Sequence, residues 1–76
     1  MDVIVAKIDQ VLFSGKADAL HVPGSEGEMT ILPHHSALIS ILRKGKVSVR
    51  SAQKELTFDI SEGILEVGQN RATVLL

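Results

Sequence analysis

Cysteine, tryptophan and tyrosine are missing from this chain of 76 residues, and phenylalanine occurs only twice. Without cysteine the chain forms neither disulfide bonds nor zinc–thiolate sites, and nothing indicates an oxidising compartment. The net charge is −1, and no basic stripe accompanies the shortage of aromatic side chains. Because nucleic-acid-binding proteins rely on basic patches and stacking aromatics, the composition argues against a nucleic-acid partner.

Long hydrophobic runs are also missing. No uninterrupted apolar run approaches the roughly 20 residues that a membrane-spanning helix requires. The first residues, MDVIVAKIDQ, open with an acid and lack the basic region of a signal peptide. Hydrophobic residues nevertheless make up 45% of the chain. A filled aliphatic core and an apolar surface that meets a partner both explain this fraction, and composition alone does not separate them.

Apolar residues recur at every second position along most of the chain. Segments 46–50 and 55–60 alternate strictly between polar and apolar residues. Such alternation is typical of strands with one face in a core. Segment 36–42 is mostly apolar, and its short length and two isoleucines favour a strand over a helix. The pattern predicts strands at 2–8, 10–14, 16–22, 28–32, 37–42, 46–51, 55–60, 63–67 and 71–76.

Turn-forming residues separate these segments at Ser14-Gly15, Pro23-Gly24, Lys44-Gly45, Glu62-Gly63 and Gly68–Asn70. Short strands with turns at this spacing predict an all-β fold, a sandwich or barrel. The chain has no repeat, linker or low-complexity segment. We therefore expect one domain that spans residues 1–76.

The segment GSEGEMTILPHHSAL, residues 24–38, is the strongest candidate for a site, because two histidines follow a proline. Neighbouring residues on a strand point to opposite faces, so His34 and His35 would share a metal only in a loop. Further ligands would have to come from His21 or from Glu26 and Glu28, and the spacing matches no metal motif. We predict no metal site.

Acid–base catalysis by His35, with Glu28 orienting its ring, would need an activated nucleophile. Ser36 and Thr30 are the available hydroxyls, and nothing in the sequence marks either as activated. The glycines follow no phosphate-binding pattern and are expected in turns. We therefore predict no catalytic residue and no cofactor.

Pro33 restricts its own backbone and favours an extended conformation at Leu32, so the histidine loop is stiff where it begins. A stiff loop loses little entropy when a partner holds it. This favours recognition over chemistry, although a plain connecting loop is an equally good interpretation of the residues alone.

Several motifs occur in a familiar order. The run LFSGKADALHVPGSEGEMTILPHHSALISIL is followed by KGKVSV, FDISEGILEV and NRATVLL. This order resembles the N-terminal domain of the ATP synthase epsilon subunit, and it covers essentially all 76 residues. The resemblance implies a flattened β-sandwich of about ten short, mostly antiparallel strands. The two-helix C-terminal domain of most family members is absent from these residues, so its inhibitory and nucleotide-sensing roles are not assigned.

The resemblance also implies a function. It implies a non-catalytic rotor subunit of the central stalk that binds the gamma subunit and the c-subunit ring and couples proton-driven rotation to ATP synthesis. Such a subunit would be peripheral, on the cytoplasmic face of a bacterial membrane, with no direct membrane insertion and a monomeric state in isolation. The alternative is a free-standing β-sandwich adaptor. Lipoyl and biotinyl carriers are similarly small, but the surroundings of Lys54 lack their motif around a modifiable lysine.

The resemblance assigns residues to the c ring by position. These candidates are Glu28, Ile31, Leu32, Pro33, His34 and His35. No residue is assigned to the gamma subunit, although an apolar sheet face would suit a coiled-coil stalk. The family's Pro-Gly-His reads Pro33-His34-His35 here, so we expect a different loop tip, because histidine enters positive φ less readily than glycine.

Overall fold

The computed structural model describes residues 1–52 and 54–76, and every regular element in them is a β-strand. The predicted all-β class is therefore confirmed, and the ambiguous segment 36–42 contributes a strand. The strands are β1 (Asp2–Lys7), β2 (Gln10–Lys16), β3 (Ala19–Gly24), β4 (Gly27–Ile31), β5 (Leu38–Leu42), β6 (Gly45–Ser51), β7 (Lys54–Ile60), β8 (Gly63–Gly68) and β9 (Arg71–Leu75).

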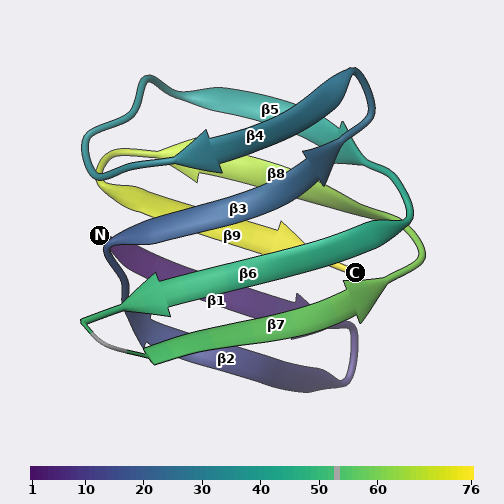
Figure 1. Ribbon diagram of the computed structural model, residues 1–76, viewed down its shortest axis with the longest axis horizontal. Coiled ribbons are helices and arrows are strands. Elements are labelled where there is room, and N and C mark those ends of the chain that lie inside the picture. Colours follow the sequence, from purple (N-terminus) through teal and green to yellow (C-terminus); the bar gives the residue numbers. More distant parts are fainter. Residues whose placement is uncertain (53) are drawn as a thin grey trace.

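The strands form two layers that lie face to face (Figure 1). The first sheet has the order β2-β1-β9-β8-β5, and the second sheet has the order β4-β3-β6-β7. Strands β1 and β9 are parallel, whereas the neighbouring pairs β1/β2, β8/β9 and β5/β8 are antiparallel. The sheets join where Gly24 of β3 pairs with Leu42 of β5. The result is a small sandwich.

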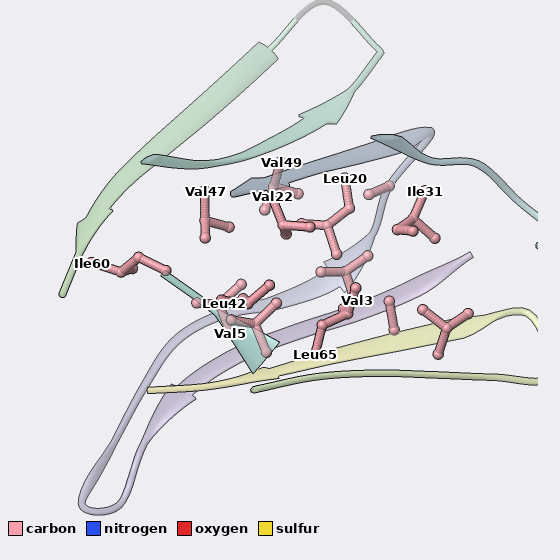
Figure 2. Close-up of a cluster of buried hydrophobic side chains, with 14 residues drawn as sticks. Val3, Val5, Leu20, Val22, Ile31, Leu42, Val47, Val49, Ile60 and Leu65 are labelled. Carbon is pink, nitrogen blue, oxygen red and sulfur yellow. The ribbon is translucent and has the colours of Figure 1, made fainter. Parts of the chain in front are cut away.

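Alternate side chains of both sheets fill the space between the layers (Figure 2). The core is built from aliphatic residues of modest size, and no polar or charged side chain is buried in residues 1–52 and 54–76. Burying each valine or leucine contributes about 1.5–3 kcal/mol, which is the main stabilising term of so small a domain. The fully buried side chains include Val3, Val5, Leu20, Val22, Val47, Leu65 and Val74.

The turn predicted at Ser14-Gly15 is wrong. Both residues belong to β2, where Ser14 pairs with Ile4 and Gly15 with Val3. Strand β1 is long enough to pair with β2 as far as Lys16, so the chain bends only at Ala17 and Asp18. As a consequence β3 begins at Ala19, three residues later than its predicted start at residue 16.

The turn predicted at Pro23-Gly24 is also wrong, since both residues end β3 and the turn falls on Ser25 and Glu26. The proline carbonyl accepts a hydrogen bond from the Arg43 backbone N–H at 2.9 Å. A Cβ on Gly24 would lie 2.6 Å from the carbonyl oxygen of Gly27. Glycine is therefore needed here for the close approach of the β3 and β4 backbones within their hairpin, rather than for a positive φ.

Lys16 and Asp2 form an exposed ion pair across β1 and β2, with Nζ 2.8 Å from Oδ1. The hydrogen bond from Lys16, and then its charge, hold the pKa of Asp2 below its ordinary value of 3.8. Because the carboxyl binds its proton more weakly in the folded chain, the pair stabilises the fold above that ordinary value. The contribution is lost as the pH falls through the lowered pKa.

Candidate partner-binding surfaces

The loop between β4 and β5 carries most of the predicted site residues. Leu32, Pro33, His34 and His35 are all exposed, and Leu32 exposes 54% of its surface. His34 has a φ of 66°, in the left-handed region that favours glycine. The histidine thus adopts a backbone conformation that glycine enters more readily, and the expected difference of the loop tip from that of the family stays a prediction.

The loop is tied to the neighbouring β8–β9 turn, which lies at the same end of the sandwich (Figure 1). The backbone N–H of His34 donates to Asn70 Oδ1 at 3.3 Å. Asn70 itself has a φ of 49°, and its carbonyl accepts a hydrogen bond from the Asp2 N–H at 3.1 Å. Within the loop, the His35 N–H donates to the Leu32 carbonyl at 3.2 Å. These bonds hold the loop in one shape before any partner binds.

Replacing His34 with glycine should stabilise the isolated chain. An L-residue in the left-handed region costs roughly 1–2 kcal/mol, and the greater freedom of glycine in the unfolded chain offsets part of this, so the expected net gain is about 0.5–1 kcal/mol. Urea denaturation of wild type and His34→Gly measures it. Ser36→Gly is the control, since Ser36 lies in the same loop without a positive φ. Equal effects of the two substitutions would contradict the explanation.

Glu28 lies apart from His34 and His35. It occupies the start of β4, while residues 32–35 follow the end of that strand. The carboxylate Oε1 accepts a hydrogen bond from Nε2 of His21 on β3, so its partner is His21 and not His35. The Nδ1 of His35 instead faces the Ser36 carbonyl at 2.7 Å. The considered acid–base pair of His35 and Glu28 is therefore not formed.

Ile31 does not belong to the surface at all. Its side chain is 1% exposed and packs in the core between the sheets. The alternation that exposes Thr30 turns Ile31 inward, so its side chain is not available to a partner in this conformation. This corrects its assignment to the c ring, and the remaining candidates are Glu28, Leu32, Pro33, His34 and His35.

A second surface, the apolar face, was not assigned to residues from the sequence. It lies on the outer side of the first sheet and consists of Ile4, Ile39, Ile41, Ile64 and Leu75, which are 40–73% exposed, while Glu66 and Thr73 lie between Ile39 and Ile4 on the same side. Ile41 pairs with Ile64, and Ile64 pairs with Leu75, so three large side chains form a continuous row across β5, β8 and β9. A groove of about 650 Å³ runs beside this row. Contiguous apolar surface of this kind marks an interaction site.

The outer side of the second sheet, the polar face, has the opposite character. Thr30, His21, Ser48 and Thr57 are paired in register across β4, β3, β6 and β7. Hydrogen bonds link these side chains in two pairs, with His21 Nδ1 3.0 Å from Thr30 Oγ1 and Ser48 Oγ 3.3 Å from Thr57 Oγ1. On the same side Lys46 Nζ donates to an Asp59 oxygen at 2.8 Å. Because its exposed side chains are polar and several of them hydrogen-bond to one another, this face is stable in contact with water.

The described residues contain no group of three or more histidine, aspartate or glutamate side chains placed to hold a metal ion. They also contain no helix long and apolar enough to cross a bilayer. What they do contain is one apolar face, one polar face and a preformed loop at one end. These features define a small β-sandwich domain, in which rigid strands fix the shape of both faces.

Comparisons with known proteins place the chain more closely. Residues 1–76 match the family described as "ATP synthase, Delta/Epsilon chain, beta-sandwich domain". The ATP synthase epsilon chain of Hydrogenovibrio crunogenus is 40% identical over 75 residues, which are 99% of this chain and 52% of the relative. That of Caulobacter vibrioides is 37% identical over 67 residues, which are 88% of this chain and 78% of the relative. The chain belongs to the ATP synthase delta/epsilon β-sandwich domain family.

Solved structures agree on the fold. A chain of the Euglena gracilis mitochondrial ATP synthase superposes with a TM-score of 0.89 at 21% identity, over 96% of this chain and 48% of that chain. A chain from the structure of the central stalk and c ring of the Tetrahymena thermophila mitochondrial ATP synthase gives a TM-score of 0.83 at 17% identity. The match covers 99% of this chain and 61% of that chain. The chain spans about half the length of several curated relatives that it matches, including the Hydrogenovibrio crunogenus protein, of which it covers 52%.

Proposed function

We propose that this chain is a central-stalk rotor subunit of an F-type ATP synthase. In this role it binds the gamma subunit and the c ring, couples proton-driven rotation to ATP synthesis, and takes no part in the chemistry itself. It belongs to a peripheral complex on the cytoplasmic face of a bacterial membrane. Membership in the family supports the proposal. The observation that carries it is the two-sided sandwich, whose apolar face leaves large aliphatic side chains exposed while its polar face does not.

The gamma subunit is the partner that best fits the apolar face. Ile41 is 66% exposed and Leu75 is 53% exposed, so covering these side chains with another protein removes apolar surface from water and favours binding. The row lies on regular, paired strands, so its shape is fixed before binding and little entropy is lost. A helical stalk with apolar side chains along one side would match such a surface.

The c ring is assigned to the exposed edge of the second sheet. Strand β4 pairs with β3 alone among the described residues, so its outer edge is open. Glu28 lies near one end of this edge, and Leu32, Pro33, His34 and His35 lie beyond the other. At about 3.3 Å per residue the edge spans roughly 13 Å from Glu28 to Leu32. The proposed contact is thus an extended edge with polar ends, which suits polar loops of the ring.

Co-purification tests the proposal. The chain, carrying an affinity tag, is expressed with the gamma subunit and c subunits of the same organism, and the material it retains is analysed by native mass spectrometry. We expect a one-to-one complex with gamma, and a larger assembly when the c ring is present. A chain that retains neither partner would contradict the proposed function.

Substitutions at Glu28 and His35 separate the two surfaces. Both side chains are exposed, so Glu28→Gln and His35→Ala should change the free energy of unfolding by no more than about 0.5 kcal/mol. Each should weaken assembly on the c ring while leaving gamma binding as in wild type. Thermal denaturation and the two binding measurements check this. A large loss of thermal stability would instead show that these side chains hold the fold together.

A further inference from the structure

His21 is placed to control Glu28. It lies on β3 directly opposite Thr30 on β4, and Glu28 is two residues before Thr30 on the same face of the sheet. The imidazole is engaged at both nitrogens, with Nε2 bonded to Glu28 Oε1 and Nδ1 lying 3.0 Å from Thr30 Oγ1. The ring therefore spans the two strands between a hydroxyl and a carboxylate.

This arrangement works in either protonation state of the histidine. The ionised carboxylate only accepts hydrogen bonds, so Nε2 carries a proton and donates it. In neutral histidine Nδ1 then accepts from the Thr30 hydroxyl. In protonated histidine Nδ1 donates to the same oxygen, because a hydroxyl group rotates to serve either role. Thr30 thus fixes the ring, and the ring fixes the carboxylate.

The second carboxylate oxygen of Glu28 is left for a partner. Within residues 1–52 and 54–76 the bond to His21 uses Oε1, and no hydrogen bond is made by Oε2. The Glu28 side chain is 58% exposed and that of His21 is 43% exposed, so both can be reached from solvent. A glutamate held by one oxygen loses less rotamer freedom on binding than a free one.

We propose that His21 is a positioning residue, which, with Thr30, holds the Glu28 carboxylate ready for a hydrogen-bond donor or cation on the c ring. The proposal rests on the proposed function, because it assigns His21 a role only through the contact made by Glu28. His21 does not touch the partner in this account. Its effect on binding must therefore vanish when Glu28 can no longer act.

A double-mutant cycle tests this dependence. Affinity for the purified cognate c ring is measured for wild type, His21→Ala, Glu28→Gln and the double variant. We expect His21→Ala to weaken binding about threefold to tenfold in the wild-type background and to have no further effect beside Glu28→Gln. Thr30→Val keeps the side-chain shape and should reproduce the effect of His21→Ala. Ser48 pairs with His21 from β6, on the other side, and Ser48→Ala should leave binding as in wild type. Additive losses from His21→Ala and Glu28→Gln would overturn the proposal.

A measurement on the chain alone separates this proposal from the proposed function. Two-bond ¹H–¹⁵N spectra report which ring nitrogen of His21 is protonated. In wild type we expect the neutral ring to carry its proton on Nε2, and in Glu28→Gln or Thr30→Val we expect a mixture of tautomers. A mixture in wild type would overturn the positioning role whatever the c-ring result. The expected tautomer together with wild-type c-ring affinity in Glu28→Gln would instead count against Glu28 as a contact.

Discussion

Ile64→Lys is expected to weaken binding of the gamma subunit by at least about thirtyfold while leaving the sandwich folded. Ile64 is the middle residue of the row that runs from Ile41 to Leu75. A lysine there would place an ammonium group at the centre of a covered apolar surface, where losses above about 2 kcal/mol are typical of central contacts. Isothermal titration of the chain with its gamma subunit measures the change.

The matched control is Thr57→Lys, which puts the same charge on the polar face of the second sheet. It should bind gamma as wild type does. Both variants should keep the wild-type strand spectrum in circular dichroism, because both positions face outward. If Thr57→Lys weakened binding as much as Ile64→Lys, net charge rather than the apolar face would be responsible.

Leu65→Ala is expected to destabilise the fold by about 2–5 kcal/mol, although Leu65 is the next residue along β8. Its side chain is 0% exposed and packs between the sheets, so truncation leaves a cavity in the core (Figure 2). A domain of this length has a total stability of roughly 4–11 kcal/mol. The variant should therefore melt more than about 10 °C below wild type, as measured by calorimetry.

Leu75→Ala is the control for this prediction. It removes the same atoms from a leucine that is 53% exposed, on the outer side of the same sheet. The substitution should lower the free energy of unfolding by less than about 1 kcal/mol, because truncating a half-exposed side chain leaves little or no cavity. Comparable losses in Leu65→Ala and Leu75→Ala would mean that the two faces of the first sheet are not packed as described.

The strands were predictable because their signal is local. Alternation along β6 and β7 reflects one face in the core and one in water, and the antiparallel register of these strands keeps both patterns aligned. Ser14-Gly15 and Pro23-Gly24 were predicted wrongly for the opposite reason. Whether such residues turn depends on the length of the partner strand and on where the two sheets meet, and neither is visible in a short segment of sequence.

The apolar face could have been suspected from adjacent apolar pairs. Ile41-Leu42 and Ile64-Leu65 each place one large aliphatic residue on either side of a strand. A sheet with one solvent-exposed face would instead alternate apolar and polar residues. What could not be predicted is that the outward residues form one continuous row, because this depends on the register of β5, β8 and β9.

The site residues show the same division. Exposure of His34 and His35 followed from their place in a loop after Pro33. The burial of Ile31 follows from the inward phase of β4. The positive φ of His34 accompanies a hydrogen bond from its backbone N–H to Asn70, thirty-six residues away, and a short segment of sequence does not reveal that contact.

Cross-linking in the assembled enzyme tests the central claim most directly. The claim is that the apolar face contacts the gamma subunit, and that the edge of β4 and the loop after it contact the c ring. Because the chain has no cysteine, each variant carries one thiol. Ile64→Cys, His35→Cys and Thr57→Cys are incorporated into the cognate ATP synthase and treated with a short thiol-to-amine cross-linker. We expect Ile64→Cys to link to gamma, His35→Cys to link to a c subunit, and Thr57→Cys to link to neither. Products with gamma from Thr57→Cys and none from Ile64→Cys would contradict the account.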